Sequence, residues 1–140
     1  MTEAIPAGDY NTVRKVGDLI FTAGMTPRRD GVLLVTGVLG AEITVDEGRD
    51  LAAFAVGRAL DAATGSLKEN DQLVSVISMT VFIASDPSFT ELSGVADGAS
   101  ERIRHALPGS PMPVRAAVGV ASLPGGAPVE VQLIGLIGHG

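Results

Sequence analysis

The chain of 140 residues has no cysteine and no tryptophan, and it has few aromatic residues and histidines. Without cysteine there is no disulfide framework and no thiol nucleophile. One tyrosine and four phenylalanines form no pattern on which RNA bases would stack. The two histidines, His105 and His139, lack partners at metal-ligand spacing, so we expect neither a metal site nor a cofactor.

Common nucleotide-binding and hydrolase motifs are also missing. The sequence contains no GxGxxG, no P-loop and no GxSxG. Residues 123–126, Leu-Pro-Gly-Gly, are glycine-rich, but no helix that could supply aligned N–H groups follows them. We therefore interpret this segment as a turn between two strands.

The charge balance is acidic, with ten basic and sixteen acidic residues and a net charge of −6. The basic residues are scattered and form no stripe that could neutralise phosphates, which argues against nucleic acid as the partner. No apolar run is long enough to span a membrane, and the first six residues do not resemble a signal peptide. We expect a cytoplasmic protein, and the mean hydropathy of +0.35 suggests that partner subunits cover some apolar surface.

The pattern of apolar residues predicts one domain, residues 1–140, in the order β-β-β-α-β-α-β-β. This order is typical of an α+β fold with helices on one face of a sheet. The expected strands cover residues 10–16, 19–23, 32–35, 71–84, 114–121 and 129–137. In the long strand, Ile77, Met79, Val81 and Ile83 are expected to form one apolar row.

Two helices are expected between the strands. Thr44 and Glu47 have capping-box spacing at the start of the first, which Gly65 would end. Asp86 and Pro87 predict the start of the second. Glycines at positions 94 and 98 weaken a helix, so we expect an irregular first half and a firm helix over residues 99–106.

The segment from residue 113 to residue 130 is interpreted as strand, turn and strand, and it carries the candidate chemistry. Arg115 stands among small residues in the first strand, and Glu130 follows the turn. If the two strands form an antiparallel hairpin that buries both apolar rows together, Arg115 and Glu130 share a face about 13 Å apart. A guanidinium with free space around it suits a small carboxylate or phosphate, and a small molecule could lie between the two residues; alternatively, Arg115 forms a surface or interface ion pair.

Three segments carry a resemblance to a known family. Residues 17–24, GDLIFTAG, are similar to a pattern G-N-L-(I/L)-(F/Y)-x-S-G, and residues 115–124 followed by 129–131 resemble a C-terminal signature. With the strand around Thr80, Val81 and Phe82, the chain resembles the YjgF/Rid family of reactive-intermediate deaminases over nearly its whole length.

The resemblance implies a chorismate-mutase-like fold and a homotrimeric barrel with a ligand cleft at each subunit interface. It also implies hydrolysis of small imine or enamine carboxylates to 2-oxo acids and ammonia, without a metal or cofactor. Arg115 would bind the carboxylate and Glu130 would position water. By the same resemblance, the other substrate-binding positions are Tyr10, Ala23, Gly24, Ser93 and Ala117.

Three of these positions depart from the family pattern. Ala23 replaces a serine, Ala117 replaces a cysteine, and Ser93 stands in place of an asparagine. The loss of polar atoms favours an alternative function, a non-catalytic trimer that binds a small metabolite such as a 2-oxo acid. Endoribonuclease or translation-inhibitor activity, also attributed to this family, is a further alternative that the acidic charge disfavours.

Overall fold

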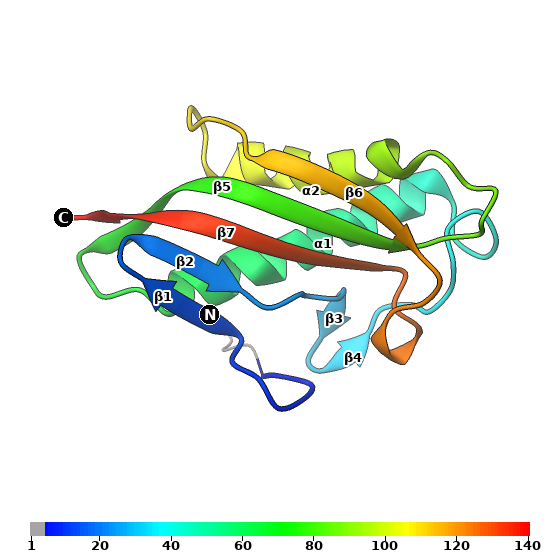
Figure 1. Ribbon diagram of the computed structural model, residues 1–140, viewed down its shortest axis with the longest axis horizontal. Coiled ribbons are helices and arrows are strands. Elements are labelled where there is room, and N and C mark those ends of the chain that lie inside the picture. The colour runs from blue at the N-terminus through cyan, green and yellow to red at the C-terminus, as the bar shows by residue number, and fades with distance from the viewer. Residues whose placement is uncertain (1–4) are drawn as a thin grey trace.

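Alternating apolar side chains build a sheet of five strands, and two helices cover one of its faces (Figure 1). In the computed structural model, which describes residues 5–140, the sheet has the strand order β1-β2-β7-β5-β6. Its strands are β1 (Val13–Val16), β2 (Leu19–Thr22), β5 (Asp71–Ala84), β6 (Val114–Val120) and β7 (Val129–His139). The remaining elements are β3 (Arg28–Arg29) paired with β4 (Val32–Leu33), helices α1 (Val45–Gly65) and α2 (Leu92–Ala106), and a short 3-10 helix, η1 (Pro124–Gly126).

This architecture confirms the predicted α+β class, with a mixed sheet. Strands β5 and β6 run parallel and the other neighbours are antiparallel. The first strand begins at Val13 rather than at Tyr10. Residues 1–4, which belong to the expected domain and to the segment examined for a signal peptide, lie outside the described residues. Between residues 5 and 140, no helix is long and apolar enough to cross a membrane.

Helix α1 begins as predicted. The Thr44 side chain accepts a hydrogen bond from Glu47 N, and the Glu47 side chain accepts one from Thr44 N. These reciprocal bonds satisfy two N–H groups that would otherwise lack partners at the helix start. The alanine-rich side of α1 is buried against the sheet.

The prediction for the second helix was wrong about where the helix starts and about its first half being irregular. Asp86 does not cap a helix; its carboxylate accepts hydrogen bonds from Ser88 N and Oγ in a turn, and α2 begins at Leu92. The first half of α2 is regular despite its glycines, and Gly98 lies against the backbone of Arg49 in α1. A side chain at position 98 would overlap that backbone, so the glycine allows close helix packing.

The strand β5 has the predicted bounds, but its apolar row differs from the prediction. Register irregularities between Leu73 and Ser75 and between Val76 and Ser78 shift the alternation. Val76 is consequently buried in the core, whereas Ile77 is 41% exposed. A bulge adds one residue to one strand, so the residues before it and those after it place odd-numbered side chains on different faces of the sheet.

The predicted hairpin between the last two strands was also wrong, because β5 lies between β6 and β7. Strand β5, helix α2 and strand β6 form a crossover, which is how parallel neighbours are connected. Met79 pairs with Arg115 in β6, and Phe82 pairs with Glu130 in β7. Met79 is buried beneath the helices and Phe82 has the opposite orientation, so Arg115 and Glu130 lie on opposite faces of the sheet.

Candidate functional site

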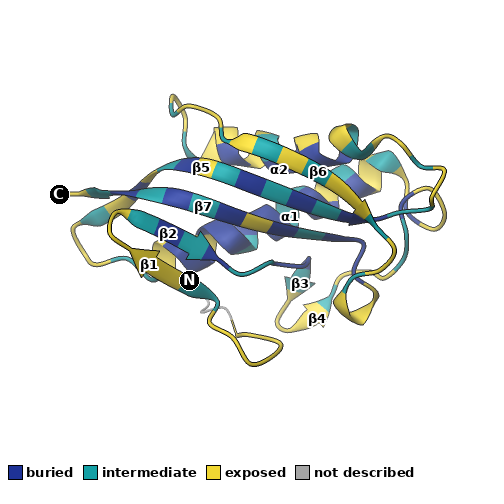
Figure 2. Cartoon of the chain, viewed as in Figure 1, coloured by how far each residue is buried: buried dark blue, intermediate teal, exposed yellow. Residues whose placement is uncertain are grey.

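A cleft of about 480 Å³ opens on the face of the sheet that the helices leave uncovered. It lies where β1 and β2 meet the start of β7 and the preceding turn (Figure 1). Burial alternates along β5 and β7, with exposed and partly buried positions between the core residues (Figure 2). The cleft is lined by Tyr10, Asn11, Arg14, Phe21, Thr22, Ala23, Gly24, Pro124 and Glu130.

Glu130 supplies the acidic group of this cleft. Its side chain projects from the second residue of β7 onto the uncovered face and is only partly exposed. Burial raises the pKa of the Glu130 carboxyl above its ordinary value, because the charged form loses hydration. Within residues 5–140, the carboxylate has no hydrogen-bond or ion-pair partner, so it is available to a ligand or to water.

Gly24 provides the space for this carboxylate. A β-carbon at position 24 would lie 2.7 Å from Glu130 Cδ, well inside van der Waals contact. Backbone bonds fix the arrangement: Met25 N donates to Val131 O at 2.7 Å, and Val131 N donates to Met25 O at 2.9 Å. The segment that follows β2 therefore runs directly beside Glu130, and only glycine fits there without displacing it.

Tyr10 and Ala23, two of the expected substrate-binding positions, also line the cleft. Tyr10 is 47% exposed, and its hydroxyl accepts a hydrogen bond from Ala7 N at 3.1 Å. Ala23 is held by a hydrogen bond from its N–H to Thr12 O at 2.8 Å. Ala23 contributes only a methyl group to the lining of the cleft, at a position where the family pattern has a serine.

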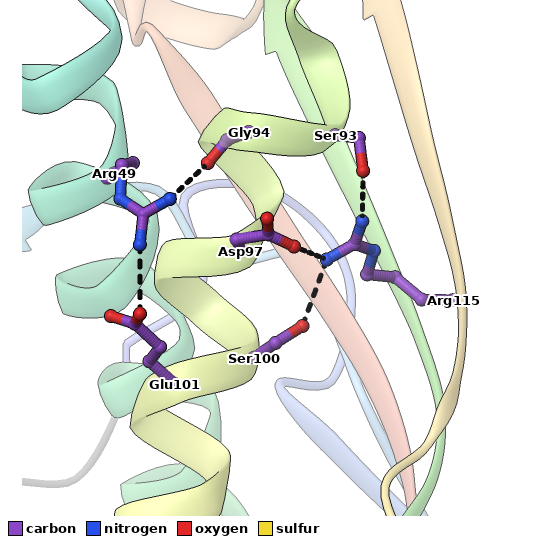
Figure 3. A network of polar contacts seen from close by, with 7 residues as sticks. All are labelled: Arg49, Ser93, Gly94, Asp97, Ser100, Glu101 and Arg115. Atoms are coloured by element: carbon purple, nitrogen blue, oxygen red, sulfur yellow. Dashed lines mark hydrogen bonds and ion pairs between the residues drawn. The ribbon is translucent and has the colours of Figure 1, made fainter.

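Arg115 lies outside this cleft, on the covered side of the edge strand β6 (Figure 3). Its Nη1 donates to Asp97 Oδ1 at 2.8 Å and to Ser100 Oγ at 3.0 Å, while Nη2 donates to Ser93 Oγ at 2.7 Å. All three acceptors belong to α2. In one chain the guanidinium is therefore part of an ion pair, which was the alternative interpretation of Arg115, and it is not surrounded by free space.

The seven predicted site residues thus form two groups. Tyr10, Ala23, Gly24 and Glu130 share the cleft. The others, Arg115, Ser93 and Ala117, lie at the β6 edge, where Arg115 is bonded to Ser93 and Ala117 packs against the core. A ligand bound between Arg115 and Glu130 cannot be held by the cleft of one chain alone.

The sequence-based prediction missed five residues that line the cleft. They are Asn11, Arg14, Phe21, Thr22 and Pro124. The sequence held a signal for two of them, Arg14 and Phe21. The two-residue turn at Gly17 and Asp18 sets the register of β1 and β2, and this register pairs Arg14 with Phe21. The position of Pro124 had no such signal, since it depends on the path from β6 across β5 to β7.

Fold and cleft together define a class of α+β proteins in which helices cover one face of the sheet and a cleft opens on the other. The family model described as Endoribonuclease L-PSP matches residues 1–137. The chain belongs to this family, which includes the YjgF proteins.

The chain is also similar to individual known proteins. Protein TCP17 from Trypanosoma cruzi is 37% identical over 140 residues, which cover 94% of this chain and 82% of that protein. The crystal structure of Atu1372 from Agrobacterium tumefaciens, a protein of unknown function, is 32% identical with a TM-score of 0.84, covering 93% of this chain and 83% of that one. Escherichia coli TdcF with bound serine shares the fold at 22% identity and a TM-score of 0.64, covering 96% of this chain and 91% of that one.

Proposed function

We propose that the protein hydrolyses small imine or enamine carboxylates to 2-oxo acids and ammonia in the Glu130 cleft. The observation that carries the proposal is a partly buried, unpaired carboxyl group with a raised pKa in a mostly apolar hollow. Such a group is a stronger base than an exposed glutamate, and its ionised form can still accept a proton from water.

The proposed reaction needs one base and one water molecule. Glu130 takes a proton from water while the oxygen attacks the imine carbon and the C=N bond becomes a single bond. Glu130 passes this proton to the nitrogen, which gives a carbinolamine. Glu130 then takes the proton of the new hydroxyl group and delivers it to the nitrogen, so that the C–N bond breaks and ammonia and a C=O group form. No oxidant or reductant is consumed, because an imine and the corresponding 2-oxo acid have the same oxidation level.

The substrate carboxylate is assigned to Arg115 of a second copy of the chain. Strand β6 is the edge of the sheet, and the Arg115 side chain remains 21% exposed there although Nη1 and Nη2 donate to α2, so a neighbouring molecule can approach the N–H donors that are left. On the opposite face of β6, the apolar residues Val114 and Val118 are 71% and 39% exposed, a surface suited to contact with another subunit. A trimer that joins each edge to the next cleft would bring Arg115 and Glu130 together across the interface.

A test of the activity uses 2-imino acids produced in solution by an L-amino acid oxidase. The wild-type protein should accelerate formation of the 2-oxo acid above the rate in buffer, measured by competition with semicarbazide trapping. Glu130→Gln and Arg115→Ala should each lose most of this acceleration. Glu69→Gln, a change at an exposed carboxylate outside the cleft lining, is the matched control and should retain it. Equal rates with wild type, variants and buffer would refute the proposal.

A non-catalytic role in binding a small metabolite is the second candidate. Ala23 favours it, because the cleft lacks a hydroxyl at this position next to Glu130. TdcF, which shares the fold, was solved with bound serine, so a small amino acid can occupy this architecture. Saturable binding of a 2-oxo acid in calorimetry, with no acceleration of imine hydrolysis, would favour this role over catalysis.

A further inference from the structure

Arg14 is the one basic residue among those that line the cleft. It lies in β1, is exposed, and was not among the residues expected to form the site. Within residues 5–140 its guanidinium forms no hydrogen bond and no ion pair. By contrast, Arg28, Arg49, Arg58 and Arg115 all donate hydrogen bonds to protein oxygens.

The strand register places Arg14 on the same face as Glu130. Arg14 pairs with Phe21, and Phe21 pairs with Ile134, four residues along β7 from Glu130. Residues paired across strands share a face, as do residues an even number apart in one strand. The Cα atoms of Arg14 and Glu130 are two strands apart, at about 4.8 Å per strand, and four residues apart along the strand direction, at about 3.3 Å per residue. These two perpendicular displacements combine to roughly 16 Å.

This separation leaves room for a small molecule between two long side chains. No ion pair joins Arg14 and Glu130 within residues 5–140, so Arg14 does not neutralise Glu130. Phe21 belongs to β2, the strand between the strands of Arg14 and Glu130. A guanidinium with five N–H donors and no protein partner binds a carboxylate through two parallel hydrogen bonds. The cleft thus offers a cationic end at Arg14 and a proton-accepting group at Glu130.

We propose that Arg14 binds a second, distal carboxylate, and that the substrates are therefore 2-imino dicarboxylic acids that yield 2-oxo dicarboxylic acids. This inference rests on the proposed function, in which Arg115 of a second copy holds the carboxylate next to the imine carbon. Arg14 then holds the other end of the molecule and decides which side chain the cleft prefers. The reaction that supplies the substrate must oxidise the α-carbon of an acidic amino acid, or remove the α-proton and a leaving group on the β-carbon from a β-substituted acidic amino acid.

The test compares two ligands of the same chain length that differ in the distal group, 2-oxoglutarate and 2-oxopentanoate. Isothermal titration calorimetry with the wild-type protein should show about tenfold or tighter binding of the diacid, the scale expected for a charge-assisted hydrogen-bonded pair at a partly exposed site. Arg14→Gln should bind both acids equally, at the wild-type affinity for 2-oxopentanoate. Arg14→Lys should keep part of the preference, and Arg104→Gln, at an exposed arginine of α2, should keep all of it.

The outcomes separate this inference from the proposed function. Diacid preference that depends on Arg14 supports the inference even when neither imine, generated from L-glutamate or L-norvaline, is hydrolysed faster than in buffer. Hydrolysis of both imines at equal efficiency, unaffected by Arg14→Gln, overturns the inference and leaves the activity standing. A loss of affinity for both acids by the same factor in Arg14→Gln also overturns it, because Arg14 would then bind the carboxylate that the two ligands share.

Discussion

Arg115 Nη1 lies 2.8 Å from Asp97 Oδ1, so an ion pair joins the edge strand β6 to helix α2. Ser93 and Ser100 accept further hydrogen bonds from the same guanidinium. The three acceptors are four and three residues apart in α2, a spacing that aligns side chains along one side of a helix. Strand β6 is therefore attached to α2 by polar contacts, whereas the central strands β5 and β7 face the helices with apolar side chains.

Removal of this guanidinium should loosen β6. We expect Arg115→Met to lower the free energy of unfolding by about 1–2 kcal/mol, since hydrogen bonds to charged groups contribute about 1.5–3 kcal/mol and partial exposure reduces that. Urea unfolding of Arg115→Met, Asp97→Ala and the double variant measures the coupling, expected at about 0.5–1 kcal/mol. Strictly additive effects would show that the ion pair contributes nothing to stability.

The raised pKa of Glu130 predicts a stability that depends on pH. The folded protein binds the proton more tightly than the unfolded chain, so stability falls as pH rises from the ordinary value of 4.5 through the folded pKa. Glu130→Gln removes this penalty and should melt at a higher temperature than wild type at pH 7. Thermal melts at pH 4 and pH 7 test this: the difference between the proteins should vanish at pH 4, and a constant difference would contradict the assigned cause.

Local signals in the sequence were sufficient for several elements. The Thr44 and Glu47 capping box fixes the start of α1, and the apolar run fixes both ends of β5. These features depend on residues close to one another along the chain. The bulges in β5 had no comparable signal, and they moved Ile77 out of the core.

The partners of strands β6 and β7 could not be obtained in the same way. Apolar alternation is equally compatible with direct pairing and with β5 lying between them, because a strand pattern does not identify its neighbour. The strand–helix–strand order of β5, α2 and β6 was the available indication of a parallel crossover. Because the crossover was not predicted, Arg115 was expected on the same face as Glu130, whereas it lies on the opposite one. The crossover does not affect the other group of residues, and the cleft brings together Glu130, Tyr10, Ala23 and Gly24.

A methyl group at position 24 should displace the Glu130 carboxylate. We expect Gly24→Ala to destabilise the fold by about 1–3 kcal/mol, the usual cost of overpacking, and to abolish activity or ligand binding in the cleft. Chemical denaturation and calorimetry with a 2-oxo acid are the measurements. The reason is steric, so the same change made in a Glu130→Ala background should cost little stability.

Gly94→Ala is the matched control for that substitution. A β-carbon at position 94 would approach no described atom closer than Val45 Cγ1 at 3.9 Å. Alanine is favoured over glycine within a helix by about 1 kcal/mol, so this variant should be at least as stable as wild type. If both variants lose stability equally, the close approach to Glu130 is not the cause of the Gly24→Ala effect.

His139 joins the end of β7 to two other parts of the sheet. Its Nε2 lies 2.8 Å from Asp18 Oδ1 in the β1–β2 turn, and its Nδ1 lies 2.9 Å from Asp71 Oδ1 at the start of β5. The hydrogen bond with Asp18, followed by that with Asp71, raises the pKa of the imidazole above 6.5. Both ring nitrogens donate only in the protonated ring, so the two carboxylates are joined best by imidazolium.

The sign of the effect follows from that raised pKa. Protonated His139 stabilises the fold fully below pH 6.5, and this contribution is lost as pH rises through the folded pKa. His139→Gln should therefore lower the melting temperature more at pH 6 than at pH 9. Amide exchange at the β7 end should report the same trend locally, since opening there becomes easier without the bridge. His105→Gln is the control, because that exposed histidine has no hydrogen bond within residues 5–140. A deficit for His139→Gln that is larger at pH 9 would show that the neutral ring, not imidazolium, holds these strands together.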